Sequence, residues 1–185
     1  MDTNYDIKDL LSDCVPHLSK IDVVSLSLIG NRYHNIIFTI TSLANPQVPD
    51  INSFNQITEL YIDSSSKLKN ISKLTSLTNL TLHYNNDIQT INTLTNLTYL
   101  NLDHNHIVSD ISNLVKLTTL SISWTKKVVT LDTLTNLKYL DLRYNKMIYN
   151  IEKLIGLTEL YVMGKIHLSS LKLPPQNINI KNHFV

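Results

Sequence analysis

The chain is 185 residues long, carries a formal charge of +1 and is 43% hydrophobic. It contains 30 Leu, 21 Ile, 21 Asn and 18 Thr, but only one Ala and three Gly. So many large aliphatic side chains exclude a disordered chain, and the near absence of Ala argues against a helical bundle. Three scattered glycines cannot build the phosphate loop of a Rossmann or P-loop enzyme, and the balanced charge indicates no nucleic-acid partner.

The first 36 residues have a helical pattern. One face of the first predicted helix carries five apolar residues: Ile7, Leu10, Leu11, Cys14 and Val15. Pro16 ends this segment. Ser19 and Asp22 then have capping-box spacing ahead of a second predicted helix over residues 23–29, which Gly30 ends.

The run from Leu18 to Tyr33, L-x-x-x-D-V-V-x-L-x-L-I-x-x-R-Y, resembles an F-box, the helical motif that docks a Skp-family adaptor. Tyr33 stands at the family's usual Trp, and Asp6-Ile7 stand where the family has Leu-Pro. The resemblance implies seven adaptor-binding residues: Leu10, Leu11, Leu18, Val23, Val24, Leu26 and Leu28. The alternative is that residues 1–36 form only an N-terminal cap.

The rest of the chain repeats every 20 residues. Six columns of six positions follow this period, and 35 of the 36 positions are aliphatic. The columns run from Ile57 to Leu157, Leu60 to Leu160, Ile62 to Val162, Leu68 to Leu168, Ile71 to Leu171 and Leu74 to Pro174. A period of this length predicts a solenoid in which each unit buries its apolar face against its neighbours.

Both ends of the array depart from the pattern. A degenerate first unit has five apolar residues, with polar Ser42 where an aliphatic is due: Ile37, Ile40, Val48, Ile51 and Phe54. At the other end Pro174-Pro175 interrupts the period, and residues 177–180 alternate like a closing edge strand that Phe184 could cover. We therefore expect helices or a cap in 1–36, repeats in 37–176 and a capping strand in 177–185.

The motif L-x-x-L-x-L-x-x-N is complete in Leu77–Asn85, Leu97–Asn105 and Leu137–Asn145. It resembles the leucine-rich repeat family over about three quarters of the chain. Ser65, Thr125 and Lys165 replace the Asn in three units, where the family's asparagine ladder would be broken. The predicted fold is a solenoid with a parallel sheet on its concave face, whose 20-residue units are too short for a helical back and return through extended or 3₁₀ segments.

The outward strand positions are the candidate binding surface. Just past the strands, four successive units place Tyr84, His104, Trp124 and Tyr144 in one file. Tyr99, Tyr139, Asp141 and Arg143 lie on the strands beside it. Amphipathic aromatics next to charges are typical of protein-binding hot spots, so these eight residues are predicted to bind a protein substrate. The alternative is that the rings stack only to stabilise the solenoid.

No catalytic, metal or cofactor site is predicted. His83, Asp103 and Ser123 share one column, but Asp lies between His and Ser, whereas a triad needs His in the middle. His83, His104 and His106 lack a carboxylate or thiol cluster to complete a metal shell. Cys14, alone on an apolar face, is predicted to be an inert core residue and, with no signal peptide or membrane span in the sequence, indicates an intracellular, cytoplasmic protein. The low Ala and Gly and high Asn, Ile and Tyr suggest an AT-rich genome, so for a viral protein the compartment would be the host cytoplasm.

Together these patterns predict a non-catalytic adaptor. The two resemblances imply an F-box/leucine-rich-repeat substrate receptor that joins a substrate protein to a Skp-cullin ubiquitin ligase. The alternative is a stand-alone leucine-rich-repeat interaction module whose N-terminal segment is only a cap.

Overall fold

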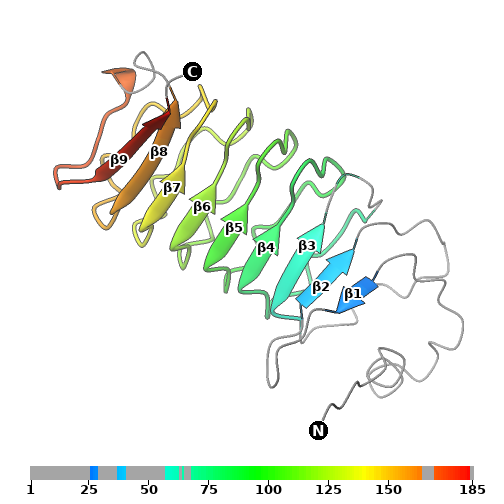
Figure 1. Ribbon diagram of the computed structural model, residues 1–185. Coiled ribbons are helices and arrows are strands. Elements are labelled where there is room, and N and C mark those ends of the chain that lie inside the picture. Colours follow the sequence, from blue (N-terminus) through cyan, green and yellow to red (C-terminus); the bar gives the residue numbers. More distant parts are fainter. Residues whose placement is uncertain are drawn as a thin grey trace, which may run out of the picture.

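In the computed structural model the chain forms a single nine-stranded sheet in the order β1 to β9 (Figure 1). The structure describes residues 26–28, 37–40, 57–62, 64, 68–163 and 169–183. Consecutive strands are neighbours throughout, so the chain advances along one axis without crossing back. This is the repeat solenoid that the 20-residue period predicts.

The regular part of the sheet is parallel and repeats without a register slip. Its strands are β3 Glu59–Ile62, β4 Asn79–Thr81, β5 Tyr99–Asn101, β6 Thr119–Ser121, β7 Tyr139–Asp141, β8 Glu159–Met163 and β9 Asn179–His183. Each residue pairs with the one 20 positions on, as Leu80 does with Leu100 and Leu100 with Leu120. Residues one period apart therefore form straight rows about 4.8 Å apart across the strands.

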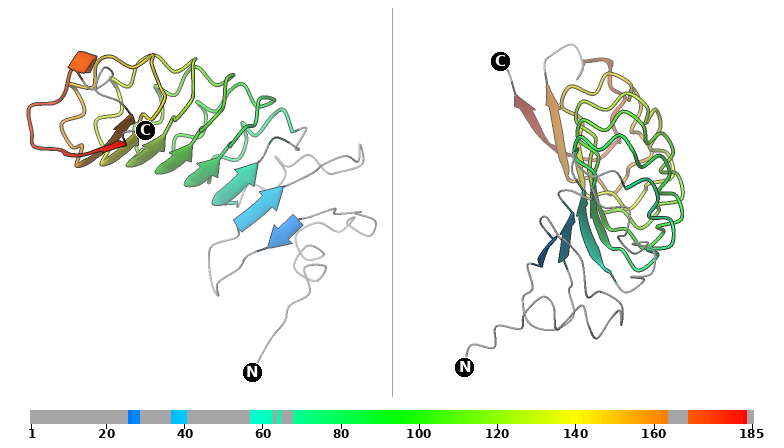
Figure 2. Two further views of the ribbon diagram at one scale, coloured as in Figure 1. Left: turned by 45° about the horizontal axis from the view of Figure 1, so that its top comes forward. Right: turned by 90° about the vertical axis from the view of Figure 1, so that its right-hand side faces the viewer.

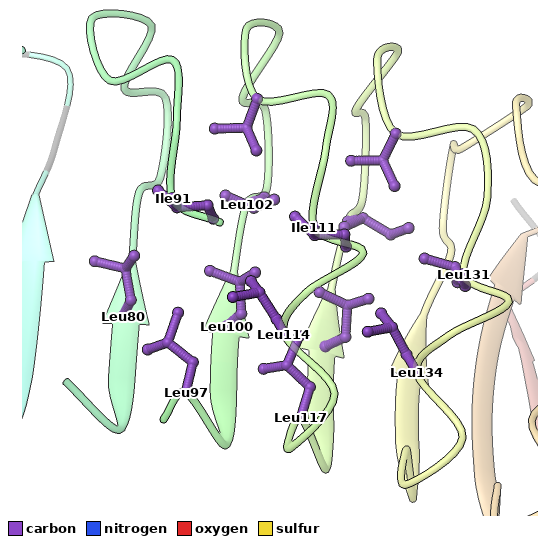
Figure 3. Packing of buried hydrophobic residues seen from close by; sticks show 14 of the residues in the cluster. Leu80, Ile91, Leu97, Leu100, Leu102, Ile111, Leu114, Leu117, Leu131 and Leu134 are labelled. Atoms are coloured by element: carbon purple, nitrogen blue, oxygen red, sulfur yellow. The ribbon is translucent and has the colours of Figure 1, made fainter. Parts of the chain in front are cut away.

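The aliphatic columns form the core. Every described residue in the six columns is buried except Leu68, which is partly buried. Side chains from the strands, such as Leu100 and Leu102, meet side chains from the returning segment, such as Ile111 and Leu114, between the two walls of the coil (Figure 3). Each fully buried leucine contributes about 1.5–3 kcal/mol from removal of its apolar surface from water.

The back of each coil consists of tight turns on the side opposite the sheet (Figure 2). In β4's unit the Leu74 amide donates to the Ile71 carbonyl at 3.0 Å, and the Leu77 amide donates to the Leu74 carbonyl at 3.0 Å. The same pair of i→i+3 bonds recurs in the following units, for example from Leu94 to Ile91. This is the 3₁₀ type of hydrogen bond, so the expected non-helical back is confirmed.

Polar side chains tie each coil to the next. Asn105 Nδ2 donates to the Asn85 carbonyl, and Asn105 Oδ1 accepts from the amides of Ile107 and Val108 at 3.0 and 2.9 Å. Thr125 changes this ladder: its hydroxyl donates to the Ile122 carbonyl of its own coil at 2.9 Å and accepts from Asn145 Nδ2 at 2.9 Å. The ladder is therefore interrupted below Thr125, as expected, but resumes above it.

The N-terminal edge differs from the helical prediction. β1, Leu26–Leu28, is a strand that pairs antiparallel with β2, Ile37–Ile40. The predicted helix over 23–29 is thus wrong at these three residues. Leu-Ser-Leu also fits the alternation of a strand, and pairing with β2 satisfies its main-chain groups in a way that a short helix at a sheet edge would not. The first predicted helix, from Ile7 to Val15 and including Cys14, lies outside the described residues.

The degenerate first unit has a different register from the one the sequence suggested. β2 is parallel to β3, with Phe38 opposite Leu60 and Ile40 opposite Ile62. The offset is 22 residues, not 20, so the predicted pairing of Ile40 and Ser42 with these columns is wrong by two positions. The shift brings apolar residues into both columns and removes the polar anomaly at Ser42. Val48, Ile51 and Phe54 lie outside the described residues.

The C-terminal edge continues the period. Pro174 is buried in the last column, and Gln176 Nε2 donates to the carbonyls of Leu154 and Leu157 at 2.9 and 3.3 Å. β9 then pairs with β8, with Ile180 opposite Leu160. The predicted closing strand is present, although it runs over Asn179–His183 and not 177–180. Phe184 lies outside the described residues. Within the described part of the chain no helix is long and apolar enough to cross a bilayer.

Candidate functional site

Three rows of outward-facing side chains cross strands β3 to β8, and we call them the sheet face. The first two rows are Glu59, Asn79, Tyr99, Thr119, Tyr139, Glu159 and Tyr61, Thr81, Asn101, Ser121, Asp141, Tyr161. The third row, two residues further along each coil, is His83, Asp103, Ser123, Arg143 and Met163. Strand alternation sends these side chains to solvent because the intervening leucines point into the core.

Tyr84, His104, Trp124 and Tyr144 stack on one another along the edge of the sheet face, and we call them the aromatic ladder. Ring centroids are 4.2 Å apart between Tyr84 and His104, 5.5 Å between His104 and Trp124 and 4.1 Å between Trp124 and Tyr144. The interplanar angles are 19°, 14° and 20°. The file that the sequence predicts is thus a continuous stack.

The backbone beneath the ladder is in the left-handed region at all four residues. Their φ angles are 56°, 57°, 59° and 58°. The coil needs this bend because each ladder residue leads from the strand into the turn in which, for example, the Asn105 amide donates to the Leu102 carbonyl at 2.8 Å. Left-handed backbone costs an L-residue with a side chain roughly 1–2 kcal/mol, and glycine or asparagine adopts it most readily. Four aromatic residues therefore stand where the backbone favours small ones.

The ladder exposes ring edges and buries ring faces. Tyr84, Trp124 and Tyr144 are 49%, 42% and 41% exposed, whereas His104 between two rings is less so. Burial in the stack, and next the nearby His83, lower the pKa of His104 below its usual value. Since the inner faces are covered by neighbouring rings, the ladder offers no free platform for a nucleobase at its middle positions. It presents a ridge of apolar edges with polar tips.

Beside the ladder, Arg143 and Asp141 form a partly buried ion pair. Arg143 Nη2 lies 2.6 Å from Asp141 Oδ2, and Nε donates to both carboxylate oxygens at 3.0 and 2.9 Å. Asp141 is 2% exposed and Arg143 39%. The hydrogen bonds to Asp141 raise the pKa of Arg143 above its usual value. The guanidinium carbon also lies 5.8 Å from the centre of the Tyr161 ring, within cation–π range.

Tyr139 packs beside this pair. Its ring centroid is 5.0 Å from that of Tyr161. Burial, and next the negative charge of Asp141, raise the pKa of Tyr139 to about 12. Tyr139 is therefore a neutral hydrogen-bonding phenol at any physiological pH, with no role as a base.

The geometry agrees with the rejection of a catalytic triad. Asp103 Oδ1 accepts from the Ser121 hydroxyl at 2.6 Å and from the Ser123 amide at 2.9 Å. Ser123 is 7% exposed and offers its backbone, not its hydroxyl, to Asp103. The His83 ring packs against Tyr84 at 4.4 Å and His104 at 5.8 Å. Across the described residues no three His, Cys, Asp or Glu side chains gather as a metal site.

The predicted site residues divide into two groups. All eight substrate-binding residues lie on the sheet face or the aromatic ladder, in two adjoining clusters. Of the predicted adaptor-binding residues, Leu10, Leu11, Leu18, Val23 and Val24 lie outside the described residues, and only the backbone of Leu26 and Leu28 is described, as strand β1. The site list from the sequence did not include Tyr161 or Asp103, although the 20-residue step from Asp141 reaches Tyr161, which was the available signal.

The repeat columns, the parallel register and the turn asparagines identify the architecture. The chain is a leucine-rich-repeat solenoid. No protein-family model matches it, and neither does any curated protein. Among solved structures, an internalin (InlF) from Listeria monocytogenes strain 4b F2365 is 21% identical over 82% of this chain and 54% of its own, with a TM-score of 0.45.

A second solved structure is the functional domain of InlJ from Listeria monocytogenes, which includes a cysteine ladder. It is 19% identical, covers 78% of this chain and 46% of its own, and has a TM-score of 0.31. The chain thus spans about half the length of the solved structures it resembles. At these values the likenesses say nothing about function, which has to be argued from the residues of the sheet face and the aromatic ladder.

Proposed function

We propose that this leucine-rich-repeat chain is a non-catalytic protein-interaction module that binds its partner on the sheet face and the aromatic ladder. One observation carries the proposal: four consecutive exposed aromatic residues occupy left-handed positions that favour glycine or asparagine. A backbone preference overridden in four coils is expected at a functional surface more than in a scaffold.

The competing explanation is that stacking alone accounts for the rings. An aromatic pair contributes about 0.5–1.5 kcal/mol, which is comparable to the left-handed strain it has to offset. The two terms nearly cancel, so stability gives little reason to keep the ladder. Binding does, because exposed aromatic edges with polar tips are the material of hot spots.

The test is the double variant Trp124→Asn with Tyr144→Asn. Asparagine tolerates left-handed backbone, so we expect the free energy of unfolding to change by less than about 2 kcal/mol while binding is lost. Binding is measured by panning a displayed library of random peptides on the wild-type chain and retesting the selected peptides on the variant. Tyr149→Asn is the matched control, because Tyr149 is 58% exposed and lies away from the sheet face.

Two results would sink the proposal. One is a selected set of peptides that binds the double variant as well as the wild type. The other is a large fall in the unfolding free energy of the variant, which would show that the rings serve the solenoid itself.

A narrower proposal is the F-box receptor of a Skp-cullin ubiquitin ligase, which rests on the sequence of residues 1–36 alone. The strand at Leu26–Leu28 falls inside the F-box-like run, where that motif is helical, and so counts against it. Co-purification with a Skp-family adaptor tests it. Absence of a complex at micromolar concentration, together with unchanged peptide binding after deletion of residues 1–36, would leave the stand-alone module.

A further inference from the structure

We infer that the sheet face recognises an arginine or lysine side chain of its partner, and that Asp103 receives the cation. This inference rests on the proposed function, since it names the chemistry of the partner that the same surface binds. Three features of the described residues carry it: the distribution of charge, the way the face already holds its own Arg143, and the unfilled position beside Asp103.

Charge is unevenly distributed over the solenoid. The sheet face carries four carboxylates, on Glu59, Asp103, Asp141 and Glu159, against one cation, Arg143, with Lys181 next to it on β9. The other described surfaces carry nine lysines against four carboxylates. The formal charge of +1 for the whole chain therefore hides a face of the opposite sign, which attracts a cationic segment and repels an acidic one.

Arg143 shows how this face binds a guanidinium group. Its Nε and Nη2 atoms meet the carboxylate of Asp141 at 2.6–3.0 Å, and its charge lies 5.8 Å from the Tyr161 ring centre. A carboxylate on the strand side and a tyrosine ring from the next coil thus hold the cation. This pairing neutralises Asp141, so the uncompensated negative charge of the face lies on the other carboxylates.

Asp103 lacks such a cation. Its Oδ1 is hydrogen-bonded to Ser121 and Ser123, both neutral donors, and no described residue donates to its Oδ2. Neither of the two described ion pairs includes it. The two serines hold the carboxylate in place, which reduces the entropy that a partner has to remove on binding.

The surroundings of Asp103 suit a long cationic side chain. The next coil carries only short side chains in the three rows, namely Thr119, Ser121 and Ser123. Tyr99 and Tyr139 stand in the first row on the two coils that flank Thr119. A lysine or arginine stem that lies across β6 would meet a tyrosine on each side and place its charge at Asp103, where a charge-assisted hydrogen bond forms.

The experiment is a two-dimensional ¹⁵N–¹H NMR titration of the full chain with acetyl-arginine amide. Acetyl-citrulline amide, which has nearly the same shape but no charge, is the matched probe. We expect saturable shifts at the amides of Ser121, Ser123 and Tyr99 with the arginine compound, and binding at least about tenfold weaker with the citrulline compound.

Asp103→Asn keeps the acceptor for the two serines and removes the charge, so we expect it to abolish the shifts while the thermal unfolding midpoint stays close to that of the wild type. Asp110→Asn is the control, because Asp110 is an exposed carboxylate on the back of the coil that accepts from the Ser112 amide. Equal binding of the arginine and citrulline compounds, shifts that persist in Asp103→Asn, or shifts spread over all exposed carboxylates would each overturn the inference.

The inference and the proposed function fail in different ways. Peptides selected on the wild-type chain that lose binding with Trp124→Asn and Tyr144→Asn, yet carry no excess of Arg or Lys and bind Asp103→Asn normally, would keep the module and remove the cation site. Peptides rich in Arg or Lys that require Asp103 support both.

Discussion

At the scale of single residues, the environment of a side chain decides its chemistry more than its type does. Asp103 and Asp141 are both carboxylates of the sheet face, yet one is held by two serines and the other by a guanidinium group. Tyr99 and Tyr139 share a row, but Tyr99 is 37% exposed, whereas Tyr139 packs against Tyr161 next to a buried charge. These differences lead to two predictions that substitution can check.

The first concerns alkaline stability. The pKa of Tyr139 is raised to about 12 in the folded chain, against about 10 for a tyrosine in an unfolded one. A raised folded pKa means that the folded state binds the proton more tightly, so this stabilisation is complete below pH 10 and is lost between about pH 10 and 12. Tyr139→Phe should therefore reduce the fall of the thermal midpoint above pH 10. Tyr149→Phe, at an exposed position, should leave it unchanged.

The second concerns the two ion pairs. Arg143→Gln leaves Asp141, which is 2% exposed, without its cation, and we expect a loss of about 1–3 kcal/mol; the partial exposure of Arg143 keeps this below the cost for a fully buried pair. Lys153→Gln breaks a pair with Asp132 whose partners are 63% and 43% exposed, and should cost less than about 1 kcal/mol. Urea unfolding of both variants measures the difference, and equal losses would contradict the assigned burial.

At the scale of the coil, each element is held by one apolar stripe and one set of turn hydrogen bonds. Asn85, Asn105 and Asn145 each accept from the amides two and three residues on, which closes the turn after the strand. Thr125 has a hydroxyl too short to do the same, and it turns back to the Ile122 carbonyl. The coil of β6 is thus the one complete described coil with an altered turn.

Thr125→Asn should repair it. An asparagine there can accept from the amides of Lys127 and Val128 and donate to the Asn105 carbonyl, as its counterparts do, and we expect a gain of about 1–2 kcal/mol in the free energy of unfolding. The reciprocal change, Asn105→Thr, removes those bonds from the neighbouring coil and should cost about as much. Urea unfolding measures both, and a stability of Thr125→Asn at or below that of the wild type would refute the role given to the ladder.

At the scale of the molecule, the solenoid separates its surfaces by position in the coil and not by position in the sequence. Every coil contributes one piece to the core, one to the back and one to the sheet face, so a surface property accumulates along the array. The aromatic ladder draws on four coils and the carboxylates of the sheet face on four coils, none of which could form either surface alone. A partner must therefore span several strands, which suits a protein segment lying along the array.

The sequence by itself determined the period, the six buried columns, the short backs and the file of aromatic residues. These follow from spacing within one coil and from the step of 20 residues, both of which are local properties. The register of β2 depended on pairing with β3, since an offset of 22 satisfies the core better than the regular step that the sequence suggested. The strand at Leu26–Leu28 likewise forms because a sheet edge was available.

Only the tertiary structure decided the chemistry of the surface. Which carboxylate meets Arg143, which meets the two serines, and which ring faces are covered all depend on side chains from neighbouring coils about 4.8 Å apart. The left-handed backbone under Tyr84, His104, Trp124 and Tyr144 was hidden as well, because aromatic residues disfavour that conformation and the sequence carried no glycine to mark it. The physical reason is the same in each case: pairing between coils overrides the preference of the single residue.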